Sequence, residues 1–153
     1  MNRRTLLKRT LAVGAVSVAA TAGLITPGQV LAAYPKDAFA AKDVASALKA
    51  ALGSDSLTES GDIKIKAPDI AENGAVVPVT VSTGMGNVDS ISILSEVNQN
   101  PLIAVFNLPG AEPYVSTRIK MGKTGNVVAV VKSGGKLYSA KKEVKVTIGG
   151  CGG

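Results

Sequence analysis

The feature that most constrains the fold is an alternation of apolar and polar residues with a period of two, which begins near residue 62. Ile63 and Ile65 alternate with Lys64 and Lys66, and the valines of residues 77–81 alternate with proline and threonine. This period is typical of β-strands that bury one face. The expected strands lie around residues 62–66, 77–82, 88–97, 102–108, 114–121, 127–132, 137–141 and 144–148.

Turn signals rich in Gly, Asn and Pro separate these seven or eight strands. They lie at residues 72–74, 84–87, 100–101, 109–110, 123–126 and 133–135. Short strands at regular spacing with turns between them favour a mainly β protein built as an antiparallel β-sandwich.

One helix is expected before the strands, from Lys36 to Leu52, because its apolar residues recur at helical spacing. Asp37 is placed to cap its start, and Gly53 can adopt the left-handed conformation that ends a helix. The sequence therefore predicts a short N-terminal helix on a β-sandwich.

The first residues are typical of a cleavable signal peptide. Residues 1–10 hold four basic residues and no acidic one, and a weakly apolar run follows from Leu11 to Leu24. These 14 residues fall short of the roughly 20 that a membrane-spanning helix needs. We expect an exported protein without a membrane anchor.

Within this leader, Arg3 and Arg4 belong to the segment Asn-Arg-Arg-Thr-Leu-Leu-Lys at residues 2–8, which looks like a twin-arginine export motif. Small residues before Ala33 predict cleavage after Ala32 and a periplasmic chain of 121 residues, 33–153. The expected parts are a twin-arginine signal peptide (1–32), a single helix-plus-sandwich carrier domain (33–148) and a flexible GGCGG arm (149–153).

The basic charge of the chain comes mostly from the leader. The whole chain has a net charge of +6, but the leader holds four of its 17 basic residues and none of its 11 acidic ones, which leaves 13 − 11, or +2. The remaining lysines are interleaved with acids and apolar residues, without an aromatic stripe. Nucleic-acid binding is therefore not expected.

The composition excludes most kinds of catalytic site. The chain has no His and one Cys, which excludes imidazole catalysis, histidine metal ligation, an internal disulfide and a two-cysteine redox pair. We expect neither a cofactor nor a metal ion, and no enzymatic activity of the chain alone.

The one thiol, Cys151, is the expected site of chemistry. It lies between Gly149 and Gly150 on one side and Gly152 and Gly153 on the other, none of which has a side chain to shield the sulfur. Extended, the three residues after Ile148 span roughly 10 Å. Such a slim arm is expected to carry the sulfur into narrow clefts of other proteins, and activation of the thiol is expected from those partners.

The chain resembles the SoxY family of periplasmic thiosulfate oxidation. The terminal Gly-Gly-Cys-Gly-Gly matches the carrier arm of that family, and residues 65–79 and 115–121 match further segments, as does the twin-arginine leader. The resemblance therefore covers essentially the whole chain.

This resemblance implies an immunoglobulin-like sandwich paired with the subunit SoxZ, and a cofactor-free carrier that binds its substrate covalently through Cys151. It also implies three partner enzymes. The cytochrome SoxAX joins thiosulfate oxidatively to the thiol as an S-thiosulfonate, SoxB hydrolyses the terminal sulfonate to sulfate, and the sulfane dehydrogenase SoxCD, where present, oxidises what remains.

Three other features favour ordinary structural roles. Pro78 cannot donate a ladder hydrogen bond, so its strand is expected at a sheet edge or at a bulge. Arg118 is the only arginine outside the leader, and an ion pair on a strand face is favoured over sulfonate binding. The segment Glu72-Asn73-Gly74 is interpreted as a tight turn rather than a binding loop.

Two other functions are consistent with parts of the sequence. A ubiquitin-like sulfur donor would use its terminal Gly-Gly carboxylate as a thiocarboxylate, but it needs cytoplasmic adenylation, which the export leader argues against. A non-catalytic sandwich module for adhesion or assembly would use Cys151 in an intermolecular disulfide.

Overall fold

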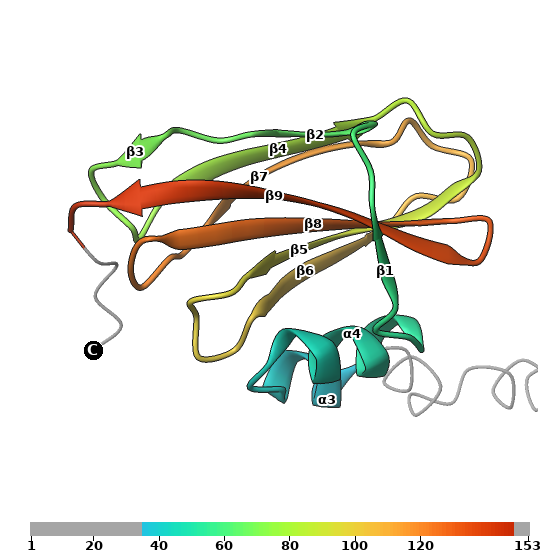
Figure 1. Ribbon diagram of the computed structural model, residues 1–153, viewed down its shortest axis with the longest axis horizontal. Coiled ribbons are helices and arrows are strands. Elements are labelled where there is room, and N and C mark those ends of the chain that lie inside the picture. The colour runs from blue at the N-terminus through green and yellow to red at the C-terminus, as the bar shows by residue number, and fades with distance from the viewer. Residues whose placement is uncertain (1–34, 149–153) are drawn as a thin grey trace, which may run out of the picture. The chain divides into compact units, whose positions relative to one another are not determined.

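The structure, a computed structural model, describes residues 35–148 and contains two short helices and nine strands there (Figure 1). The helices are α3 (Lys36–Ala40) and α4 (Val44–Leu52). The strands are β1 (Leu57–Glu59), β2 (Ile63–Lys66), β3 (Ile70–Ala71), β4 (Val77–Thr83), β5 (Val88–Ser95), β6 (Leu102–Asn107), β7 (Tyr114–Ile119), β8 (Gly125–Ser133) and β9 (Lys136–Val146).

The strands form two sheets, which confirms the mainly β class. The larger sheet has the order β1-β9-β8-β5-β6, with β3 also paired to β9, and the smaller has the order β2-β4-β7. Long strands pair antiparallel, as expected. The short strands β1 and β3 instead run parallel to β9 along one edge, β1 at Leu137–Ser139 and β3 at Lys145–Val146.

The prediction of two separate strands near the C-terminus was wrong, because β9 is continuous from Lys136 to Val146. The two residues between the expected strands, Lys142 and Glu143, stay in the ladder with β8, opposite Val127 and Asn126. A tight turn at Gly134 and Gly135 joins β8 to β9, with φ values of 56° and 77°. Such a two-residue turn requires left-handed backbone, which glycine adopts without strain.

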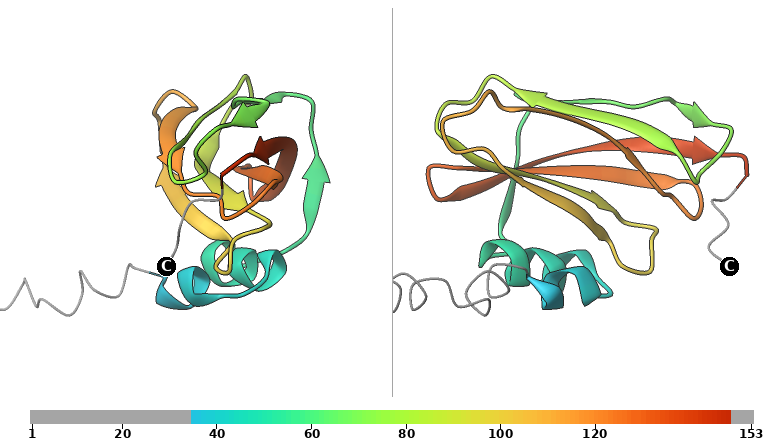
Figure 2. Two further views of the ribbon diagram at one scale, coloured as in Figure 1. Left: turned by 90° about the vertical axis from the view of Figure 1, so that its left-hand side faces the viewer. Right: turned by 180° about the vertical axis from the view of Figure 1, so that it is seen from behind.

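Two apolar cores hold three layers together. Between the sheets lie mainly valine and isoleucine side chains, among them Val79, Ile91 and Val131. The helices lie against the opposite face of the larger sheet (Figures 1 and 2). There Ala47 and Leu48 of α4 form a second core with residues of that sheet. Because the sheet is covered on both faces, residues 127–131 of β8 are all buried rather than alternating.

The single helix expected from Lys36 to Leu52 was wrong in detail, since it is broken into α3 and α4 at residues 41–43. Asp37 lies inside the first turn of α3 and does not cap it. Asp43 caps α4 instead, accepting a hydrogen bond from the Ser46 N–H at 2.8 Å, and this bond lowers the pKa of the Asp43 carboxyl. Gly53 ends α4 at a φ of 81°, as expected.

Pro78 lies in the central strand of the smaller sheet, so the expectation of an edge strand or a bulge was wrong for β4 as a whole. The proline is tolerated because β2 is short. It pairs with β4 only from Thr80 to Thr83, whereas Pro78 is paired with Arg118 of β7 alone. One side of β4 therefore has no ladder partner at Pro78.

Candidate functional site: the base of the C-terminal arm

The expected site of chemistry, Cys151, lies outside the described residues, as do Gly149, Gly150, Gly152 and Gly153 of its arm. The export-signal residues Arg3 and Arg4 lie outside them too, as does the expected cleavage site. What the structure describes is the arm base, which we define as Val146, Thr147 and Ile148, the last residues before the arm.

The loop before β8 forms a hydrogen bond with the arm base on one side. The Thr124 hydroxyl accepts a hydrogen bond from the Val146 N–H at 2.8 Å. On the other side lies β3 with the residue before it. The Lys145 N–H donates a hydrogen bond to Asp69 O at 2.9 Å, and the Thr147 N–H donates one to Ala71 O at 3.1 Å. The backbone N–H groups of Lys145, Val146 and Thr147 thus all have a hydrogen-bond partner.

The turn Glu72-Asn73-Gly74 forms hydrogen bonds with Thr147 and Ile148 of the arm base. The Gly74 N–H donates to Ile148 O at 2.9 Å, and the Thr147 hydroxyl donates to Glu72 O at 3.2 Å. The side chain of Asn73 accepts a hydrogen bond from the Ala75 N–H at 2.9 Å, which is typical of an Asx-type turn. The interpretation of this segment as a turn is confirmed, but sequence reasoning missed that it holds the arm base.

The same turn ties the arm base to the smaller sheet. Gly74 O accepts a hydrogen bond from the Met121 N–H at 2.7 Å, just after β7, and β4 begins three residues beyond Gly74. The segments that meet here are far apart in sequence but adjacent in space, where β9 and β3 end on the same side of the molecule (Figures 1 and 2). The arm therefore leaves from a junction that both sheets hold.

The charged groups near the arm base include one ion pair, between Lys142 and Asp69 at 3.1 Å. Arg118 is exposed on β7, and no carboxylate of residues 35–148 lies within 4.0 Å of it, so the ion pair expected there was wrong. Among these residues, no group of three or more His, Cys, Asp or Glu side chains could hold a metal ion.

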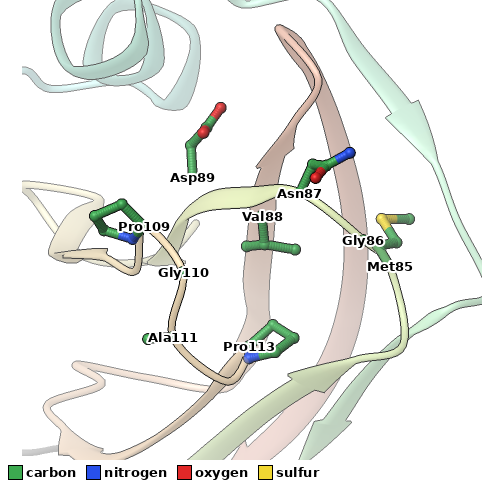
Figure 3. A pocket seen from close by; sticks show the side chains of 9 residues that line it. All are labelled: Met85, Gly86, Asn87, Val88, Asp89, Pro109, Gly110, Ala111 and Pro113. Carbon is green, nitrogen blue, oxygen red and sulfur yellow. The ribbon is translucent and has the colours of Figure 1, made fainter.

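The described surface includes two depressions of several hundred Å³. One pocket of about 480 Å³ lies between the turn after β4 and the turn after β6, with Asp89 as its charged side chain (Figure 3). Because β4 starts beside the arm base and ends at this pocket, the two are at opposite ends of the sandwich. A second depression, of about 640 Å³, lies on the outer face of the smaller sheet beside Lys64, Lys66 and Tyr114.

In the part of the chain that the structure describes, no helix is long and apolar enough to cross a membrane.

The reactive group that the sequence places next to the arm base is a single thiol, three residues beyond the hydrogen-bonded Ile148. Such a thiol can form and release a covalent bond to sulfur.

Comparison with known proteins agrees with this reading. The family model described as "Sulfur oxidation protein SoxY" matches residues 48–151, a span that includes Cys151. The chain is also similar to the solved structure of the sulfur carrier protein SoxY from Chlorobium limicola f thiosulfatophilum. The identity is 53%, the match covers 67% of this chain and 94% of that chain, and the TM-score is 0.61. A comparison with curated proteins finds no match.

Proposed function

Because the chain belongs to the SoxY family and is a sulfur carrier of the Sox system, we propose that its Cys151 holds the sulfur intermediates of thiosulfate oxidation. The observation that carries this proposal is the position of the one thiol. Cys151 lies three residues beyond Ile148, whose carbonyl is hydrogen-bonded to Gly74. Three extended residues span roughly 10 Å, so the Cα of Cys151 can lie no further than that from the anchored Ile148.

The proposed cycle begins with oxidative loading. The outer sulfur of thiosulfate joins the Cys151 sulfur, the thiol proton is released, and two electrons pass to the c-type cytochrome SoxAX. The product is a cysteine S-thiosulfonate. SoxB then directs water to the terminal sulfonate sulfur, the adjacent sulfur–sulfur bond breaks, and sulfate leaves while a persulfide stays on Cys151. SoxCD, where present, oxidises the remaining sulfur.

In this cycle the carrier contributes attachment and delivery rather than catalysis, and it needs no cofactor or metal ion. Covalent attachment keeps each small oxyanion at the protein and raises its effective concentration at the next enzyme. The sandwich, which we assign to the immunoglobulin-like class, serves as a rigid body that presents the arm.

The test of this proposal is Cys151→Ser in a system reconstituted from the purified carrier and its partners. An alcohol cannot form the sulfur–sulfur bond, so thiosulfate-dependent turnover should be lost while the circular dichroism spectrum and partner binding are retained. Appreciable turnover by the variant would refute the proposal.

We further propose that the chain acts in the periplasm as a heterodimer with SoxZ, and that the pair folds in the cytoplasm before export through the twin-arginine pathway. A leader of this type suits folded cargo, and a pair that is stable before export would bury roughly 1,200 Å² or more. Replacing Arg3 and Arg4 by Lys should then retain both subunits in the cytoplasm. Normal levels of SoxZ in the periplasm while this chain stays inside would contradict joint export.

A further inference from the structure

The large exposed apolar side chains of residues 35–148 gather near the arm base. Four such side chains are more than half exposed, namely Ile70 (58%), Val76 (52%), Tyr114 (53%) and Ile148 (66%). Three of the four lie on the segments that hold the arm, whereas Tyr114 pairs with Ser82 towards the other end of the smaller sheet. Scattered exposed apolar residues are ordinary, but a local concentration of them marks a contact surface.

Ile70 and Val76 each lie near Ile148 because the hydrogen bonds of the arm base hold their segments beside it. Ile70 lies in β3 opposite Lys145, three residues before Ile148. Val76 lies two residues beyond Gly74, whose N–H binds Ile148 O. At the rise of a β-strand, the Cα atoms of Ile70 and Val76 are within roughly 12 Å of the Cα of Ile148. We call Ile70, Val76 and Ile148 the arm-base collar.

The length of the arm fixes what must touch this collar. Cys151 follows Ile148 by three residues, so its Cα can move at most roughly 11 Å from that of Ile148. When a cleft binds the sulfur well below its rim, the arm must be nearly fully extended. The rim then contacts the collar, because the residues up to Ile148 are hydrogen-bonded to the domain and cannot enter the cleft with the sulfur.

The composition of the arm gives a second reason for contact. Glycine offers no side chain for a partner to bind and loses more backbone freedom on ordering than any other residue. Residues 149–153 are glycine apart from Cys151. The free energy that holds the arm in a cleft must therefore come largely from other surfaces, and burial of apolar side chains next to the arm supplies it.

We propose that the arm-base collar is the docking surface for partner enzymes, and that it packs against an apolar rim around the cleft in which the group on Cys151 is processed. This proposal rests on the proposed function of Cys151 as the attachment site. The partner surface is defined by its chemistry, an uncharged apolar rim no further than the arm's length from the reacting atom.

The test compares Ile70→Asp and Val76→Asp with Tyr114→Asp, a control that places the same charge at a similarly exposed apolar site away from the arm. Each variant is prepared with SoxZ and loaded without a partner enzyme by tetrathionate. The Cys151 thiolate takes the thiosulfonate group in this reaction, and thiosulfate leaves. Sulfate release by purified SoxB is then measured against carrier concentration.

Both collar variants should load with tetrathionate like the parent protein but show about a tenfold lower kcat/KM with SoxB, the loss expected for a central contact. Tyr114→Asp should stay within about twofold, the range of a residue outside the contact. Two extra glycines between Ile148 and Gly149 should restore part of the loss in the Asp variants, because a longer arm lets the sulfur reach the cleft without burying the introduced carboxylate against the rim.

Three results would overturn the proposal. One is an unchanged kcat/KM in both collar variants, and another is an equal loss in Tyr114→Asp. The third is loss of SoxZ from the collar variants with normal sulfate release, which would assign the collar to the subunit contact. By contrast, sulfate release from a Cys151→Ser carrier treated in the same way would refute the proposed function itself.

Discussion

Replacing Leu48 by Ala should separate the stability of the helical layer from the function of the arm. Leu48 lies on α4, is 1% exposed, and packs in the core between the helices and the larger sheet. Its neighbours there include Leu94, Val128 and Val130 of β5 and β8. Both of these strands are paired on each side within the sheet, so the sheet cannot move to fill the space.

The magnitude follows from this confinement. Removing three carbons of a fully buried side chain loses about 2 to 2.5 kcal/mol of transfer free energy, and an uncollapsed cavity adds to that loss. The free energy of unfolding should fall by about 3 to 4 kcal/mol, measured by urea denaturation with an unchanged m-value.

The matched control is Lys49→Ala, which changes an exposed residue of the same helix and should shift the free energy of unfolding by about 0.5 kcal/mol or less. Val128 of this core is opposite Lys141 in the β8–β9 ladder, and the arm base begins five residues further on, roughly 17 Å along β9. At a low temperature at which Leu48→Ala stays folded, the loading of Cys151 should therefore be unchanged. A loss of stability below about 1 kcal/mol would refute the packing of α4 on the sheet.

Three further predictions concern the start of β8, an ion pair and the arm. Gly125→Ala should lower the free energy of unfolding by about 1 to 3 kcal/mol in urea denaturation, because its Cβ would lie 2.1 Å from Cγ1 of Val97. The pKa of Glu96 lies below its ordinary value of 4.5, through hydrogen bonds from Lys141 and then Asn126. The stability that this gives is present above pH 4.5 and is lost as the pH falls below it, so Glu96→Gln should flatten this part of the pH dependence of unfolding. Gly150→Val and Gly152→Val should slow loading and release without unfolding the domain, and reconstituted turnover within about twofold of the parent for both would show that slimness is unimportant.

The sequence predicted β4 because its period of two reflects burial of one face, as in Val77 to Val81. It did not predict β1 and β3, which are three and two residues long and exist through parallel pairing with β9. Nor did it predict that Lys142 and Glu143 stay in a strand. Whether these segments form strands depends on the neighbouring strands with which they pair, and the local residue pattern does not show which strands those are.

Part of the candidate site could also be predicted from the sequence, and part could not. Cys151 could be identified because the rest of the composition excludes other chemistry, and because its glycine neighbours are unusual. The anchoring of the arm base could not, since the bond from the Thr147 hydroxyl to Glu72 O joins residues 75 positions apart. Exposure of Ile70 and Val76 was equally hidden, because it depends on where the edge of the sheet lies.

The most direct test of the central claim is the intact mass of the carrier purified from cells that are oxidising thiosulfate, followed by peptide mapping under non-reducing conditions. The account predicts a population whose mass is increased by a sulfur-oxyanion group or by extra sulfur, with the increment on the C-terminal peptide that contains Cys151. A carrier found only as the unmodified thiol, or only as a disulfide-linked dimer through Cys151, would contradict it.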